Sequence, residues 1–403
     1  MGNVVVDQIG AAGTLLHGTD TTLSVRARAE LLLSALPGAT RETYAGVAVV
    51  AFENQVILSR QITYLGTPWE VYKKRIQIPK SWLEVHRQAA QDGLVVRFVG
   101  VYHYESSTIF VDFDPITYIA RKANNSAAHV STNDLFQAQT LGQFSRQDKN
   151  GNRLTSVRSD EFATYLRSGY DEPNPHVEVL DRFSEKFLDG SRVEGLRAVQ
   201  EMYTAGWPDK FQNEWAGFYL EFRLSRYLAE HDLQSHITVQ KVKRKGEFDY
   251  DLRFLDHGVL AHYGDLKASN ITVSGSPGND AANFFRCLEE FGRFWYVIYE
   301  HETWHGRDNG DVATIAWNEW RRSVGHVGRE AVYNPLSYAR KFKEAVRFVR
   351  VKVLEVNQAN VGVVLGDFQK DFKQPDGSLR QGKVMIQKKD IDNFLIYRKS
   401  IET

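Results

Sequence analysis

The stretch from residue 246 to residue 270, GEFDYDLRFLDHGVLAHYGDLKASN, constrains the fold of this 403-residue chain more than any other. Its pattern predicts a β-hairpin, with a first strand from Phe248 to Leu255 and a second strand from Val259 to Lys267. Asp256-His257-Gly258 has the composition of the connecting turn. The hairpin carries acidic residues on both strands, so it is a candidate site as well as a fold element.

These acidic side chains are predicted to converge. Alternate residues of a strand share a face, so Asp265 and Lys267 point the same way, and Asp249 and Asp251 also share a face. Carboxylates held a few ångströms apart repel each other, and a divalent cation with oxygen ligands is the usual counterion. We therefore expect a metal site at one edge of the sheet, to which either Asp249 or Asp251 contributes.

The spacing resembles the PD-(D/E)xK motif of type II restriction endonucleases and related nucleases. Asp251 stands for the first acidic residue and Asp265-Leu266-Lys267 for the second half, although no proline precedes Asp251. The resemblance implies a restriction-endonuclease-like core, with a mixed central sheet flanked by helices. It also implies Mg2+-dependent hydrolysis of phosphodiester bonds in double-stranded DNA, with Mn2+ as a substitute ion.

The resemblance assigns a role to each site residue. Asp251, Asp265 and the carbonyl of Leu266 would ligate Mg2+, and Glu221 would join them directly or through water. Lys267, placed between carboxylates, would stay largely protonated. It would orient the attacking water and stabilise the charge that builds on the phosphate.

Glu221 lies in a segment with helical periodicity, residues 213 to 233. It is three residues from Leu224, which places a carboxylate on or beside the apolar face of the helix. A buried carboxylate requires a partner or a function. In the resembled family a helix before the hairpin often supplies one more glutamate to the metal. The alternative is a glutamate at the edge of the apolar stripe, paired with Arg223 or Arg226.

Composition sets wide limits. Hydrophobic residues make up 42% of the chain and charged residues 25%, as in ordinary globular proteins, and the formal net charge is zero. A neutral chain does not coat nucleic acid through bulk charge, but a local basic cleft stays open. The single cysteine, Cys287, excludes an intramolecular disulfide and a cysteine-based zinc site. Without a signal-peptide pattern or a long apolar run, we expect a cytoplasmic enzyme with no membrane contact.

We expect two domains and an α+β or α/β class. Residues 1–170 predict a mixed α+β domain with a role in DNA recognition, and residues 171–403 predict the catalytic domain. The segment SGYDEPNPH, residues 168–176, is typical of a linker. After the Glu221 helix and the hairpin come a helical segment, residues 280–293, and a strand-like run, residues 294–300. This order resembles the α-β-β-β-α-β core of the family, with the third strand of the hairpin sheet left open.

Two polar stretches are candidate DNA contacts. Residues 121–160 are dense in Asn, Gln, Ser, Thr and Arg, side chains that read base edges or hold phosphates. The contacts predicted from sequence are Arg121, Lys122 and Asn124 in this segment and Ser269 and Asn270 after the motif. The alternatives are a long polar surface loop for the first stretch and a simple strand end for the second.

Basic residues form two further groups. A run from Lys241 to Lys245 precedes the hairpin, and either holds the DNA backbone or forms an exposed strand end. Residues 336–353 predict a basic amphipathic helix, with Arg347 and Arg350 among the cations on one face. That face either lies along a phosphate backbone or is only solvated.

The segment His301-Glu-Thr-Trp-His305 matches the letters of the zinc-protease motif H-E-x-x-H. That chemistry requires both histidines on one helix, with a third ligand beyond. This segment follows a strand-like run and is broken at Gly306, so we expect a strand end, with the metalloprotease as a minor alternative.

The predicted function is a sequence-specific type II restriction endonuclease. Cutting a palindrome on both strands calls for a homodimer, since twofold DNA symmetry is met by twofold protein symmetry. A modification-dependent nuclease or a recombination and repair nuclease has the same core and stays open. A different class is a non-catalytic DNA-binding protein, or a protein-binding module, that keeps the fold.

Overall fold

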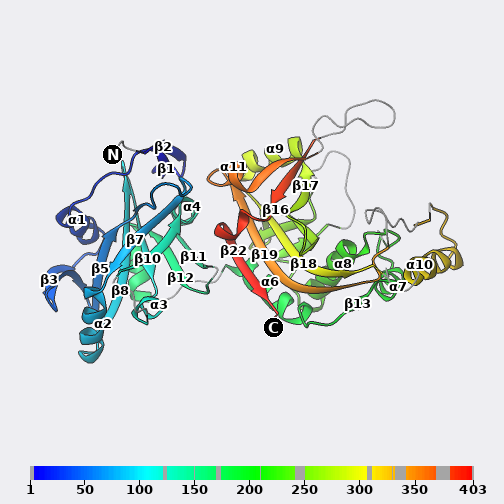
Figure 1. Ribbon diagram of the computed structural model, residues 1–403, viewed down its shortest axis with the longest axis horizontal. Coiled ribbons are helices and arrows are strands. Elements are labelled where there is room, and N and C mark those ends of the chain that lie inside the picture. Colours follow the sequence, from blue (N-terminus) through cyan, green and yellow to red (C-terminus); the bar gives the residue numbers. More distant parts are fainter. Residues whose placement is uncertain are drawn as a thin grey trace. The chain divides into compact units, whose positions relative to one another are not determined.

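A computed structural model describes residues 4–120, 125–148, 150–168, 174–208, 210–240, 250–305, 311–328, 330–331, 342–368 and 382–401 (Figure 1). The chain forms two compact units, each mixing helices with sheets. The first unit comprises Met1–Glu172, Gln358–Asn360 and Asp392–Ile396, and the second comprises Pro173–Asn357, Val361–Ile391 and Tyr397–Thr403. The fold is therefore mixed α+β, and two short C-terminal segments belong to the first unit. Among the described residues, no helix has the length and apolar character needed to cross a bilayer.

A seven-stranded sheet, in the order β11-β12-β9-β8-β5-β4-β3, forms the first unit. Its strands are β3 (Thr40–Tyr44), β4 (Val47–Phe52), β5 (Gln55–Gln61), β8 (Val95–Tyr104), β9 (Ser107–Phe113), β11 (Gln143–Gln147) and β12 (Arg153–Arg158). Both faces are covered, because neighbouring β8 residues Phe98 and Val99 belong to two different apolar clusters. The helix α2 (Ser81–Gln91) packs on one cluster through Trp82, and α1 (Val25–Ala35) packs on the other through Leu32.

Where the structure describes it, the polar segment of residues 121–160 is not a surface loop. Its described part forms β10 (Asn125–Ser131), α4 (Thr132–Leu141), β11 and β12. A capping box between Ser131 and Asp134 begins α4, and every residue from Thr132 to Ala138 is buried. Arg146 donates to the buried Asp134 at 2.8 Å. The loop interpretation is wrong because these polar side chains satisfy each other inside the unit; Arg121, Lys122 and Asn124 lie outside the described residues.

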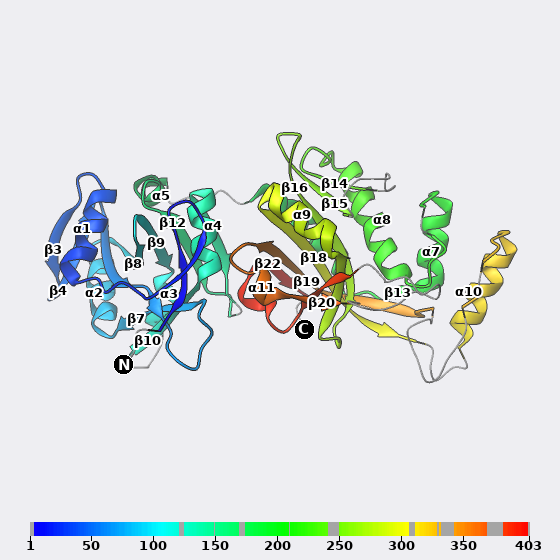
Figure 2. The ribbon, with the colours of Figure 1, turned by 90° about the horizontal axis from the view of Figure 1, so that it is seen from above.

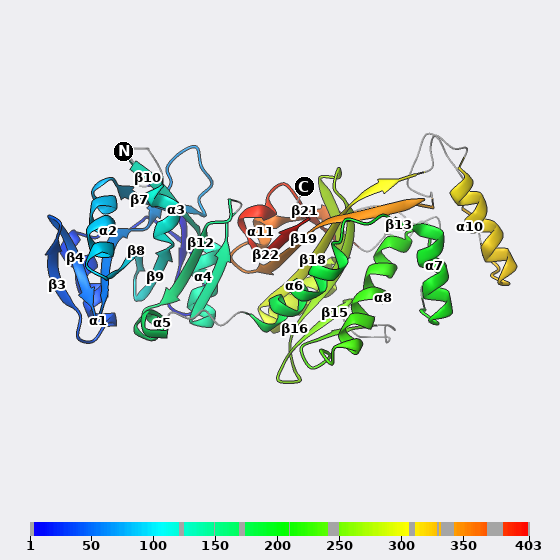
Figure 3. The same ribbon diagram turned by 90° about the horizontal axis from the view of Figure 1, so that it is seen from below.

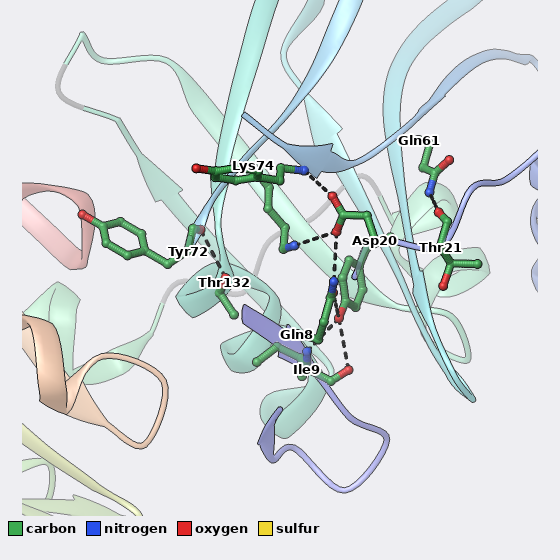
Figure 4. Close-up of polar contacts among 10 residues, drawn as sticks. Gln8, Ile9, Asp20, Thr21, Gln61, Tyr72, Lys74 and Thr132 are labelled. Atoms are coloured by element: carbon green, nitrogen blue, oxygen red, sulfur yellow. Dashed lines mark hydrogen bonds and ion pairs between the residues drawn. The ribbon is translucent and has the colours of Figure 1, made fainter. Parts of the chain in front are cut away.

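A second polar network joins the N-terminal strand β1 (Val6–Ile9) to β7 (Lys73–Pro79) (Figure 4). Lys74 of β7 is fully buried and donates from Nζ to Oδ1 of Asp20 at 3.0 Å. The side chain of Gln8 donates to the same oxygen at 2.9 Å. Burial lowers the pKa of Lys74, and the charge of Asp20 opposes that shift. The lysine is retained in the core because it has this carboxylate partner. Here β1 pairs with β2 (Leu15–Gly18), whereas β7 lies between β6 (Thr63–Tyr64) and β10.

The second unit is built on a mixed sheet in the order β13-β19-β18-β16-β15-β14, with β22 also paired to β19. Its strands are β13 (Val193–Glu194), β14 (Ile237–Val239), β15 (Leu252–Asp256), β16 (Val259–Asn270), β18 (Arg293–Trp304), β19 (Ala345–Asn357) and β22 (Leu395–Ser400). β16 runs parallel to β18 and antiparallel to β15. The predicted hairpin is confirmed from Leu252 onward, whereas residues 248 and 249 lie outside the described residues. The strand β14 supplies the strand that the sequence left open.

Helices cover both faces of this sheet (Figures 2 and 3). They are α6 (Pro175–Phe187), α8 (Trp215–Glu230) and α9 (Ala281–Phe291). The helix α7 (Gly195–Thr204) packs on α8, and α10 (Val312–Ser323) packs on α7. Phe284 of α9 packs on Tyr296 of β18, whereas Phe183 of α6 packs on Tyr299. Positions 296 and 299 point to opposite faces of a strand, so α9 and α6 lie on opposite sides.

Three short strands form a separate small sheet, β17 (Gly275–Asp280), β21 (Lys383–Gln387) and β20 (Leu365–Phe368). The remaining elements are α3 (Pro115–Ile119), α5 (Phe162–Ser168), α11 (Val361–Val364) and the 3-10 turn η1 (Ile391–Asn393).

The predicted basic helix over residues 336–353 is wrong where the structure describes it. Ala345–Asn357 is the strand β19, paired along its length with β18, and residues 332–341 lie outside the described residues. Valine recurs along this run, and branched side chains favour the strand. The arginines pair inside the sheet: Arg347 lies 2.6 Å from a carboxylate oxygen of Glu302, and Arg350 lies 2.6 Å from one of Glu300.

Candidate functional site

The hairpin of β15 and β16 places the motif residues. His257 and Gly258 occupy the turn with φ of 47° and 81°, the left-handed pair of a tight two-residue hairpin. Leu252 pairs with Gly264, so the register sets Asp251 opposite Asp265 at the open end of the hairpin. The backbone N–H of Asp251 donates to the carbonyl of Gly264 at 3.1 Å. The two carboxylates that the motif requires therefore meet across one pair of strands.

Asp251 lies in a strongly acidic environment. Burial raises its pKa well above the usual range, and the neighbouring carboxylates of Asp265 and Glu221 raise it further, while Lys267 opposes them. Asp265 itself is only 2% exposed. The backbone N–H of Leu266 donates to Oδ2 of Asp251 at 3.3 Å and helps to hold that carboxylate. Three carboxyl groups and one ammonium group thus interact at this end of the hairpin.

Lys267 completes the constellation from the same strand as Asp265. Its ammonium group contacts Oδ2 of Asp265 directly. The lysine side chain is 23% exposed, against 2% for the aspartate. Solvent and a ligand from solvent can therefore reach the cation, while the carboxylate beneath it is shielded.

Glu221 of α8 is close enough to this site to interact electrostatically with Asp251. The alternative partners are engaged elsewhere: Arg226 lies 3.2 Å from Glu201 and 2.9 Å from Glu230, and Arg223 donates to the hydroxyl of Tyr219 at 2.8 Å. The charge of Glu221 contributes to the raised pKa of Asp251, which places the two carboxyl groups near each other.

The donor set suits a hard divalent cation. Within the described ranges, which leave out Asp249, no three side chains of His, Cys, Asp or Glu are close enough to enclose a metal ion together. Mg2+ commonly takes one or two carboxylates and completes its shell with water and substrate phosphate oxygens. The Asp251 and Asp265 pair meets that requirement, and the charge repulsion between them favours an added cation.

Ser269 and Asn270 are engaged within the protein. Nζ of Lys388 donates to the hydroxyl of Ser269 at 3.3 Å and to the carbonyl of Asn270 at 2.9 Å. The side chain of Asn270 donates to Thr303 at 3.2 Å and accepts from the backbone N–H of Thr272 at 2.9 Å. These contacts fit the strand-end alternative better than a direct phosphate contact.

A buried ionic cluster around Glu300 adjoins the motif strand, and sequence reasoning missed it. Glu300 of β18 is 1% exposed and pairs in register with Ser269 of β16. Its carboxylate lies 2.7 Å from Lys388, 2.6 Å from Arg350 and 3.8 Å from Lys352. Burial alone would raise the pKa of Glu300, but these cations lower it. The partners of Glu300 lie far apart in the sequence, so no local sequence pattern predicts the cluster.

The zinc-protease alternative is wrong. β18 continues through Trp304, so His301 lies in a strand and not on a helix shared with His305. His301 is fully buried, and its Nδ1 bonds to the hydroxyl of Thr303 at 2.9 Å. The basic run from Lys241 to Lys245 lies outside the described residues.

Comparison with known proteins gives a match for part of the first unit. No curated protein and no solved structure matches the chain. The model of a family described as Methylase-associated X1 matches residues 53–166, which contain β5, β8, β9, α4 and β12.

Proposed function

We propose that this chain is a Mg2+-dependent DNA endonuclease that acts as the restriction component of a restriction-modification system. The observation that carries the proposal is the pairing of Asp251 with Asp265, beside Lys267 and near Glu221. These are the residue types and the spacing of the PD-(D/E)xK motif that the sequence resembles.

The order of elements around the site supports the same proposal. The helix α8 precedes β14, β15 and β16, and α9 and then β18 follow, with β17 inserted before α9. The first three of these strands form an antiparallel run, and β18 pairs parallel to β16. This is the α-β-β-β-α-β order that the resemblance implies.

The family match supports the assignment to a restriction-modification system. The matched family is described as methylase-associated, and DNA methylases are the partners of restriction enzymes. The match falls in the first unit, to which we assign recognition of the double-stranded DNA target. Cutting both strands of a palindrome would require a homodimer.

Under this proposal, Asp251, Asp265 and the carbonyl of Leu266 would hold Mg2+, and Glu221 would join them directly or through water. The ion, when bound, neutralises charge on the scissile phosphate and lowers the pKa of bound water. Lys267, which is partly exposed and contacts Asp265, would orient the attacking water and stabilise the developing negative charge. Burial of Asp265 keeps bulk water from screening these interactions.

The test is cleavage of plasmid DNA by the purified chain with and without Mg2+. Sharp fragments are expected, and Lys267→Ala should slow cleavage by ~10²–10³-fold or more, because one preorganised charge at a reacting phosphate is lost. DNA binding by this variant should persist. Lys389→Ala, an exposed lysine elsewhere in the unit, is the matched control and should cut at the normal rate.

Each other outcome has a distinct meaning. Unimpaired cutting by Lys267→Ala, or cutting in excess chelator, would refute the site. Intact plasmid together with tight DNA binding would favour the non-catalytic class. A parallel digestion of methylated plasmid separates a conventional restriction enzyme, which methylation of its own target blocks, from a modification-dependent nuclease.

A further inference from the structure

The helices α6, α7 and α8 line a cavity of about 500 Å³ in the second unit. Figure 3 shows where these three helices run. This volume lies within the usual range for small-molecule sites. Arg223, which lines the cavity, follows Glu221 by two residues and therefore lies roughly 200° around α8 from it. The cavity is thus a separate feature from the carboxylate site.

Arg223 is held in the wall of the cavity by aromatic rings. Its guanidinium lies 5.9 Å from the ring centre of Phe187 and 5.6 Å from that of Tyr219. Nη1 also donates to the hydroxyl of Tyr219 at 2.8 Å. These contacts fix the orientation of the guanidinium and leave its other N–H groups available to a ligand.

Two further cations line the same cavity from the other helices. Lys186 of α6 lies 5.2 Å above the ring of Tyr227, and its Nζ contacts Nε2 of His231 at 2.9 Å. Arg197 of α7 is exposed on the cavity wall. Across the part of the chain that the structure describes, none of Lys186, Arg197 and Arg223 has a carboxylate within 4.0 Å.

The acidic residues of the cavity are already paired. Arg226 forms ion pairs with Glu201 at 3.2 Å and with Glu230 at 2.9 Å, and Arg192 forms one with Glu194 at 2.9 Å. The lining therefore holds five cationic and three acidic side chains, an excess of two positive charges. A concave site with unpaired cations on three helices attracts a compact anion with more than one charge.

We propose that this cavity binds a phosphate-bearing small molecule of nucleotide size, with Lys186, Arg197 and Arg223 as its phosphate ligands. Guanidinium groups match phosphate oxygens in a bidentate geometry, which favours phosphate over an isolated carboxylate. A single phosphate leaves most of the cavity empty, so the ligand carries further phosphates or a base and sugar. This inference does not depend on the endonuclease proposal.

The test is calorimetric titration of the full chain with ATP and with inorganic tripolyphosphate, in Mg2+-free buffer at low and at physiological salt. Both probes should bind, more weakly at high salt. Arg197→Gln should weaken binding about ten-fold or more, because a charge-assisted hydrogen bond is lost. The exposed position of Arg197 makes this variant safe for folding, and Arg197→Gln with Arg223→Gln should lose binding altogether. Arg182→Gln, on α6 but paired with Glu178, is the matched control and should bind as the original chain does.

The two probes identify the source of the phosphate. Tighter binding of ATP than of tripolyphosphate supports a nucleotide, and equal binding supports a site that reads phosphates alone. Failure of both probes to bind, or equal binding by Arg197→Gln and the original chain, overturns the proposal. If a short DNA duplex displaces ATP and itself loses affinity in Arg197→Gln, the cavity is a contact for the DNA backbone and the small-molecule assignment is overturned.

Discussion

Replacement of Asp251 by Asn should stabilise the metal-free protein while destroying its cleavage activity. The aspartate is partly buried, and its pKa is raised well above the usual range by desolvation and by the nearby charges of Asp265 and Glu221. Asparagine keeps the shape and the acceptor oxygen for the N–H of Leu266 but removes the charge. The substitution therefore removes the repulsion between carboxylates in the folded state. It has no comparable effect on the unfolded chain, where the carboxylates are far apart.

Substitutions that improve the charge balance of a folded protein commonly stabilise it by about 0.5–2 kcal/mol. The gain for Asp251→Asn is therefore expected to be about 1–2 kcal/mol at neutral pH. For a unit of this size that raises Tm by about 2–8 °C. Because the folded pKa is raised, the stability of the metal-free original chain falls as pH rises from about 3.9 through that pKa. Asp251→Asn should lack this fall.

The assay is thermal unfolding in chelator and in Mg2+, at several pH values. Mg2+ should stabilise the original chain, by about 2.7 kcal/mol at a hundred times Kd, and should leave Asp251→Asn nearly unchanged. Asp256→Asn, an exposed aspartate of the same hairpin, is the control and should alter neither Tm nor the Mg2+ response. A lower Tm for Asp251→Asn in chelator, or an undiminished response to Mg2+, would refute the reasoning.

Two further predictions concern buried charges. Asp134→Ala should lower the free energy of unfolding in urea by about 3–5 kcal/mol, because it leaves Arg146 buried without its counterion. Asp160→Ala, which breaks a more exposed pair, should lower it by less than about 1 kcal/mol, and equal losses in the two variants would contradict the argument. Glu300→Gln should cost about 3 kcal/mol, because Lys388 and its neighbours lose their shared carboxylate. Since the pKa of Glu300 is lowered, its contribution to stability should be fully present above the ordinary glutamate pKa and should disappear as pH falls through the lowered value. If Glu300→Gln loses the same stability at every acidic pH, this account is wrong.

Local periodicity carried the sequence interpretation where it succeeded. The hairpin has a two-residue turn between strands of alternating polarity, and α8 has an apolar stripe. Each of these patterns can be recognised within fewer than twenty consecutive residues. The same patterns brought Asp251, Asp265 and Lys267 together, because strand pairing fixes which side chains face each other.

The errors arose where long-range contacts decide the structure. The run that became β19 also fits a helical spacing of cations, and its branched valines together with pairing to β18, Glu300 and Glu302 select the strand. The polar residues of α4 look solvated in the sequence, since a side chain reveals its partner only after folding. The Glu300 cluster joins residues that are distant in the chain and has no local signature.

The division of the chain also affects how the protein can be taken apart. The polypeptide crosses between the two units after residues 172, 357, 360, 391 and 396. Asn360 bonds to Asn133 at 3.2 Å, and the ring of Phe394 lies 4.9 Å from that of Tyr72, so the returning segments complete the first unit. A protease nick at the first crossing would leave the halves tethered by four other passages. A gene fragment ending at residue 172 would encode the first unit without residues 358–360 and 392–396, which complete it. Neither unit can therefore be exchanged between proteins by joining the chains at a single position.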